Sequence, residues 1–142
     1  MALLALDVGS KRIGIAVADP AGTFAMPLCV VERRNVRDDI ARIAEILKEY
    51  GATELVVGDP VTLSGGRGLA AERIDGFVKA LARVFLGTIH RTDERMTTAQ
   101  ATKSLIAADV SRSKRKQVID KMAAALILES FLARRKREGT VV

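Results

Sequence analysis

Three acidic residues lie where the sequence predicts buried or partly buried structure. Asp7 interrupts an apolar run over residues 3–8, Glu94 follows a short predicted strand over residues 88–91, and Asp120 lies on a predicted helix. A carboxylate inside a protein is costly unless it is paired or holds a metal ion. Oxygen-only ligands suit Mg²⁺ or Mn²⁺ better than zinc. Two such ions would activate a water molecule and stabilise the departing oxygen of a phosphodiester.

The helical position of Asp120 supports its inclusion in this group. Positions 120, 124, 127 and 131 share one helical face, which here carries Asp120, Ala124, Ile127 and Phe131. The acid thus begins an otherwise apolar stripe, and a run of small residues over 123–125 would let the helix pack closely. The alternative interpretation is an acid near a helix N-terminus, stabilised by the helix dipole and a neighbouring lysine. We therefore treat Asp7, Glu94 and Asp120 as candidate catalytic and metal-binding residues.

An α/β pattern would position these acids. Short apolar runs, bounded by glycine and other turn residues, alternate with helical periodicities. The predicted strands cover residues 3–8, 13–18, 26–32, 55–57 and 88–91, and the predicted helices cover residues 36–50, 69–85, 97–108 and 114–135.

This order predicts one five-stranded mixed sheet with helices on both faces. The first three strands form an antiparallel meander, and the last two, reached through helices, run parallel to the first. Asp7 and the pair Asp93–Glu94 then lie towards the carboxyl ends of their strands, where ligand sites gather in such sheets. We expect a single domain over residues 1–136, followed by a C-terminal tail over residues 137–142.

The distribution of basic residues predicts a polyanionic partner. The net charge is +6, and residues 112–137 carry nine basic side chains against two acidic ones. Nucleic acid is the commonest cytosolic polyanion, although the basic residues after position 132 are equally consistent with a solvated tail. The candidate nucleic-acid-binding residues belong to the cluster before Asp120 or adjoin the other acids, and they are Lys11, Arg12, Arg95, Arg112, Lys114, Arg115 and Lys116.

The composition also indicates where the protein is located. The only cysteine, Cys29, excludes an intramolecular disulfide, and no apolar run approaches the length of a membrane span. We therefore expect a cytoplasmic protein with no membrane partner.

The chain also resembles the YqgF family (also called RuvX) of Holliday junction resolvases, which have an RNase H-like fold. The matching stretches occur in the family's order and span nearly the whole chain, and they are Leu6–Ala16, Val56–Pro60, Asp93–Ala101 and Lys114–Leu128. The resemblance implies that Asp7, Glu94 and Asp120 bind catalytic metal. It also implies a bacterial nuclease that acts on branched DNA or matures the 5′ end of pre-16S ribosomal RNA. A homodimer would suit a two-fold symmetric junction.

Asp59 departs from the pattern of this family, which has an apolar residue between Gly58 and Pro60. It is a further candidate metal ligand, as is Asp93, although an Asp-Pro turn at a strand end is common and is the interpretation that the residue pattern favours for Asp59.

Two other function classes are compatible with the sequence. A nucleic-acid-binding module without catalysis would share the basic cluster but gain nothing from the acids. An actin-like ATP-binding protein would share the Asp-x-Gly-Ser hairpin, but it binds nucleotide between two such domains.

Overall fold

The computed structural model describes residues 2–59, 69–93 and 112–139, and the side chains within residues 2–59, 72–92 and 122–138. Its strands are β1 (Ala2–Val8), β2 (Arg12–Ala18), β3 (Ala25–Glu32), β4 (Ala52–Asp59) and β5 (Thr88–Asp93). Its helices are α1 (Val36–Glu49), α2 (Leu69–Ala82) and α4 (Arg112–Gly139). The predicted helix over residues 97–108 lies outside the described residues.

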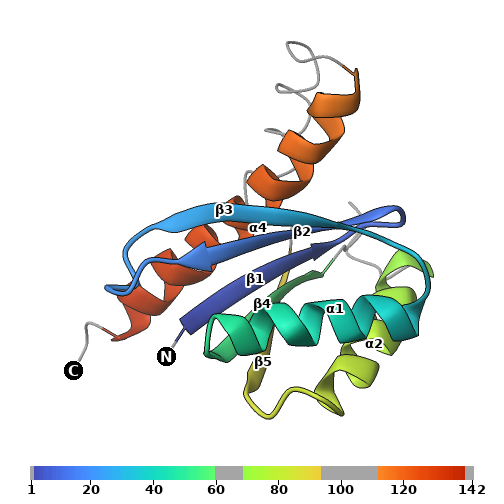
Figure 1. Cartoon of the computed structure of the whole chain (residues 1–142). Helices are drawn as coiled ribbons and strands as arrows, with labels where there is room; N and C mark the ends of the chain where they lie inside the picture. Colours follow the sequence, from blue (N-terminus) through green and yellow to red (C-terminus); the bar gives the residue numbers. More distant parts are fainter. Residues whose placement is uncertain (1, 60–68, 94–111, 140–142) are drawn as a thin grey trace.

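The strands form one sheet in the order β3-β2-β1-β4-β5 (Figure 1). The pairs β1–β2 and β2–β3 are antiparallel, whereas β1–β4 and β4–β5 are parallel. This arrangement confirms the predicted five-stranded mixed sheet. It also brings β1 to the centre of the sheet, with β4 beside it.

Side-chain alternation along the strands separates two apolar cores. In β1, Leu4 and Leu6 pack with α1 and α2 on one face, while Leu3 and Ala5 pack with α4 on the other. Figure 1 shows the same division, with α1 and α2 on one side of the sheet and α4 on the other. Helices therefore cover both faces, as predicted.

Local signals account for the bounds of α1. The side chain of Asn35 accepts a hydrogen bond of 2.9 Å from the backbone N–H of Asp38, which caps the first turn. At the other end Gly51 has a φ of 62°, a left-handed conformation that ends a helix with little strain only in glycine. The helix predicted over residues 36–50 is therefore confirmed to within one residue at its end.

Small residues allow α4 to lie close to the sheet. Ala124 and Ala125 are buried in the same cluster as Ala5 and Ala16, which are register partners on β1 and β2. The helix extends from Arg112 to Gly139, so it is longer than predicted and includes the first three residues of the predicted tail.

Candidate active site

Asp7 is buried at the carboxyl end of the central strand. Only 6% of its surface is exposed, and it is the penultimate residue of β1. Strand alternation places position 7 on the face of Leu3 and Ala5, which is the face that α4 covers. Its register partner on β2 is Gly14, which contributes no side chain beside the carboxylate. The carboxylate therefore belongs to the face of the sheet that α4 covers.

The helix that carries Asp120 covers this same face. The C-terminal half of α4 reaches the start of β1, since Leu132 and Leu3 belong to one buried cluster (Figure 1). The helix runs back along the sheet, and Ala124 and Ile127 are completely buried in this cluster. Position 120 lies one helical turn before Ala124, in the direction of the carboxyl end of β1.

Most of the other predicted site residues lie outside the described residues or on the part of α4 whose side chains are not described. Glu94 and Arg95 lie outside the described residues. Asp120 and the four basic residues Arg112, Lys114, Arg115 and Lys116 are on α4, where the backbone is described and their side chains are not. In the turn after β1, Lys11 is exposed, while Arg12 lies 3.8 Å from Glu32 across β2 and β3.

Polar contacts from α4 to β4 and β5 fix the helix on the sheet. Arg134 donates a hydrogen bond of 2.9 Å to the buried hydroxyl of Thr92. Arg135 donates two hydrogen bonds, of 2.5 and 3.0 Å, to the carboxylate of Glu54, and its guanidinium lies 4.6 Å from the ring centroid of Phe131. Because α4 carries both Asp120 and the basic cluster, these contacts help to set where those residues lie.

The ion pair between Glu54 and Arg135 changes the pKa of both groups. Hydrogen bonding from Arg135, with a smaller effect of a 3.1 Å contact with His90 Nε2, lowers the pKa of Glu54 to about 2 against the opposing effect of burial. The same pairing raises the pKa of Arg135. His90 thus takes part in a structural contact between β4 and β5.

Asp59 forms an ion pair on the opposite face of the sheet from Asp7. Arg91 donates hydrogen bonds of 3.0 Å to both Asp59 on β4 and Asp75 on α2. Asp59 follows Leu55 and Val57 in strand alternation, and both of these pack with α1 and α2. This pairing favours a structural role for Asp59 over metal binding. Asp93 is its register partner on β5.

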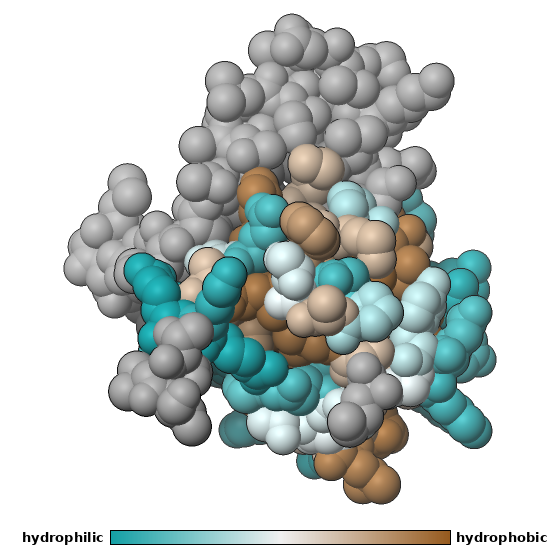
Figure 2. Space-filling view, turned by 90° about the vertical axis from the view of Figure 1, so that its left-hand side faces the viewer, coloured by the Kyte–Doolittle hydropathy of each residue, from teal (hydrophilic) through white to brown (hydrophobic). Residues whose placement is uncertain are grey.

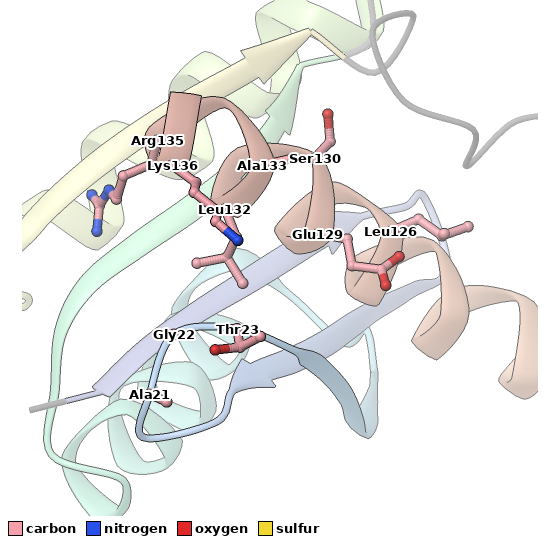
Figure 3. Close-up of a pocket in the computed structure, with 10 residues that line it drawn as sticks. All are labelled: Ala21, Gly22, Thr23, Leu126, Glu129, Ser130, Leu132, Ala133, Arg135 and Lys136. Carbon is pink, nitrogen blue, oxygen red and sulfur yellow. The ribbon is translucent and has the colours of Figure 1, made fainter. Parts of the chain in front are cut away.

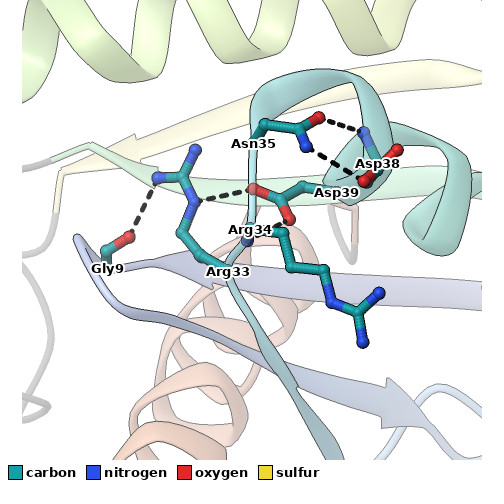
Figure 4. A network of polar contacts seen from close by, with 6 residues as sticks. All are labelled: Gly9, Arg33, Arg34, Asn35, Asp38 and Asp39. Carbon is teal, nitrogen blue, oxygen red and sulfur yellow. Dashed lines mark hydrogen bonds and ion pairs between the residues drawn. The ribbon is translucent and has the colours of Figure 1, made fainter.

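A network that the sequence analysis missed holds the turn between β1 and β2 (Figure 4). Arg33, just after β3, donates hydrogen bonds to the carboxylate of Asp39 (3.1 Å) and to the carbonyl of Gly9 (3.0 Å). Asp39 also accepts one of 3.0 Å from the backbone of Arg34. The sequence does contain a local signal for the buried carboxylate of Asp39. This residue begins the apolar stripe of α1, just as Asp120 begins that of α4.

Two hollows lie at the other end of the sheet from Asp7. One, of about 740 Å³, lies between the turn over residues 21–23 and the C-terminal half of α4, as Figure 3 shows. The other, of about 770 Å³, includes Leu3, Thr53 and Leu132. Figure 2 views this end of the molecule and shows apolar surface bordered by hydrophilic side chains. Neither hollow includes a predicted site residue.

Within the described part of the chain, no three histidine, cysteine, aspartate or glutamate residues lie close enough together to hold a metal ion. None of the helices α1, α2 and α4 combines the length and the apolarity that crossing a membrane requires.

Comparisons with known proteins agree with this architecture. The RuvX family, described as Holliday junction resolvase, matches residues 1–134. A protein of Moorella thermoacetica named "Putative pre-16S rRNA nuclease" is 42% identical over 139 residues, which cover 98% of this chain and 99% of that protein. A protein of Desulforudis audaxviator with the same name is 43% identical over 136 residues, which cover 96% of each chain.

A solved structure shares this fold. The RuvC protein of T. thermophilus, solved in complex with a Holliday junction substrate, aligns with a TM-score of 0.62. The alignment covers 99% of this chain and 97% of RuvC, at 15% sequence identity, and it confirms the predicted fold class. The family match over residues 1–134 and the close curated relatives together establish that the chain belongs to the RuvX family.

Proposed function

We propose that this member of a nuclease family is a metal-dependent endonuclease that hydrolyses phosphodiester bonds in structured nucleic acid. The observation that carries the proposal is the position of Asp7. It is a buried carboxylate at the carboxyl end of the central strand, beside Gly14 and on the face that α4 covers. Burying a carboxylate is costly, so an acid at this strand end suits a chemical role better than a packing role.

The chemistry of the candidate ligands suits Mg²⁺ or Mn²⁺. Asp7, Glu94 and Asp120 offer only carboxylate oxygens, which these ions prefer. Glu94 follows β5 directly in the sequence, and Asp120 lies on the helix that packs on the face of Asp7. When bound, a pair of ions would lower the pKa of a water nucleophile and stabilise the leaving oxygen. The contribution of the chain would be to bring the three carboxylates to one edge of the sheet.

Basic residues next to these acids would bind the substrate backbone. Lys11 lies in the β1–β2 turn after Asp7, and Arg12 begins β2. Arg95 follows Glu94 in the sequence, and Arg112 and residues 114–116 belong to the first turns of α4. Phosphate contacts of this kind position a nucleic acid without reading its sequence. The names of the curated relatives make a pre-16S rRNA fragment the first substrate to test, and the family description adds a four-way DNA junction.

The decisive experiment compares the wild type with Asp7→Asn. Both proteins are incubated with each substrate in Mg²⁺, in Mn²⁺ and in excess chelator. We expect Asp7→Asn to lower cleavage by at least about a hundredfold, since even groups that only orient metal ligands are worth 10–100-fold. Binding of the same substrates should stay within about threefold, because the basic residues are intact.

Asp38→Asn is the matched control, because Asp38 is an exposed carboxylate on the outer side of α1. This variant should cleave like the wild type. Full cleavage by Asp7→Asn would refute the assignment of Asp7. Binding without cleavage by the wild type in either metal would instead favour a non-catalytic nucleic-acid-binding module.

A homodimer and a cytoplasmic location stay predictions within this proposal. Sedimentation of the free protein and of its complex with a four-way junction tests the first. Two protomers on one junction would support the dimer, and one protomer on each junction would contradict it.

A further inference from the structure

The β1–β2 turn is held by a side chain from outside the hairpin. The turn is closed by a hydrogen bond of 2.9 Å from the backbone N–H of Gly9 to the carbonyl of Arg12. Arg33 adds two further contacts. Its backbone N–H donates to the carbonyl of Lys11 at 2.9 Å, and its guanidinium donates to the carbonyl of Gly9 at 3.0 Å. Both sides of the turn are therefore tied to the segment between β3 and α1.

Arg33 is itself held in place by a buried charge. The carboxylate of Asp39 is only 2% exposed and accepts hydrogen bonds from the Arg33 side chain and from the Arg34 backbone (Figure 4). A buried carboxylate that loses its cationic partner is strongly destabilising, so Asp39 constrains where the guanidinium can lie. The guanidinium also lies 5.4 Å from the ring centroid of Phe77 on α2. Contacts with α1 and α2 therefore fix the direction in which Arg33 reaches the turn.

Only arginine can make this set of contacts. Its planar guanidinium directs separate N–H groups to Asp39 and to Gly9 while its face rests near an aromatic ring. Lysine would keep the positive charge next to Asp39, but a single ammonium on a flexible stem does not reproduce the rigid fork. The pair thus does more than neutralise a buried acid, since it also sets the position of the turn.

We propose that Arg33, held by Asp39, is a positioning residue that presents the β1–β2 turn to the nucleic-acid backbone. The turn begins two residues after Asp7 and carries Ser10 and Lys11, both exposed. Phosphate contacts by this turn would be sensitive to its position, because misplacement by about 1 Å can remove much of the benefit of an oriented contact. This inference rests on the proposed function, since it assumes that nucleic acid is the substrate.

The test compares Arg33→Lys with Arg42→Lys. Both are the same substitution without a change of charge, but Arg42 makes an exposed ion pair with Glu45 on the outer side of α1. We expect Arg33→Lys to raise KM, and the Kd measured in chelator, about tenfold, which corresponds to ~1.4 kcal/mol of binding. The value of kcat should stay within about twofold, because a contact made equally in the ground and transition states changes KM alone. Arg42→Lys should match the wild type.

Two further measurements separate positioning from general stability. Amide hydrogen exchange at residues 9–12 should accelerate in Arg33→Lys and not in Arg42→Lys. Asp39→Asn should also raise KM, although it adds a net positive charge, whereas a purely electrostatic effect would lower KM. All assays are run at least about 15 °C below the Tm of each variant, so that the kinetic values refer to folded protein.

Several results would overturn the inference. An unchanged KM and Kd in Arg33→Lys, with a lowered Tm alone, would assign Arg33 to stability only. A lower KM in Asp39→Asn would assign the effect to charge. Failure of the wild type to cleave any substrate would count against the proposed catalysis, whereas Kd measured in chelator with a labelled four-way junction and a labelled pre-16S fragment would still test Arg33.

Discussion

The contact between Arg135 and Glu54 should make the stability of this protein depend on pH in a defined direction. Glu54 accepts two hydrogen bonds from Arg135, and its pKa falls from 4.5 to about 2. A shift of this size would correspond to roughly 3 kcal/mol if it were fully realised. The carboxylate is 31% exposed and the guanidinium 42%, so solvent screening reduces the contribution to about 1–2 kcal/mol.

The sign follows from the lowered pKa. An acid with a lower pKa in the folded state stabilises the fold above its unfolded-state pKa, near 4.5 for Glu54, and this contribution is lost as the pH falls towards 2. Arg135→Gln should therefore lower the free energy of unfolding by about 1–2 kcal/mol at pH 7. At pH 3 the difference from the wild type should be less than half as large.

Urea denaturation at several pH values from 7 to 3 measures these differences. Lys136→Gln is the matched control, because it removes one positive charge from the neighbouring exposed position of α4. It corrects for the general effect of net charge on acid unfolding. Two outcomes would show that the ion pair does not hold α4 on the sheet. Arg135→Gln would lower the free energy of unfolding by the same amount at every pH from 7 to 3, or it would lower it only as much as Lys136→Gln does.

Two local changes should affect stability in proportion to the contacts they remove. Asn35→Ala should cost about 1 kcal/mol by removing the N-cap of α1, and Asn35→Ser should restore most of it, as measured by urea denaturation. Gly9→Ala would place a Cβ 2.8 Å from the backbone carbonyl oxygen of Arg12, so the turn must shift. It should lower stability by about 1–3 kcal/mol, and an unchanged Tm would contradict the geometry of the turn.

Much of the sheet could be predicted because its signals are local. The glycine-containing turn between two apolar runs predicted the β1–β2 hairpin, and the intervening helices predicted that β4 and β5 run parallel to β1. The prediction for β4 was too short, covering residues 55–57 of a strand that spans Ala52–Asp59. Its first residues include Thr53 and Glu54, whose polar side chains interrupt the apolar pattern by which the strand was predicted. Pairing with β1 and β5 nevertheless extends the strand over these residues.

The partners of Asp59 could not be predicted in the same way. Arg91 lies 32 residues from Asp59 and 16 residues from Asp75, and no local pattern joins these three positions. The decisive information is which face of the sheet each side chain occupies, and it emerges only when strand register is known. Asp7 and Asp59 both lie near the carboxyl ends of neighbouring strands, yet alternation places them on opposite faces.

The same reasoning distinguishes two acids that look alike in sequence. Asp39 lies four residues before Ile43 and Asp120 four residues before Ala124, so each begins an apolar helical stripe. This pattern identifies a carboxylate that needs a partner, and the face of the sheet determines which partner it meets. Helix α1 lies on the face of Leu4 and Leu6, where Asp39 receives Arg33. Helix α4 lies on the face of Asp7, so the proposed metal site requires the carboxylates of Asp7 and Asp120 to share a cation on that face.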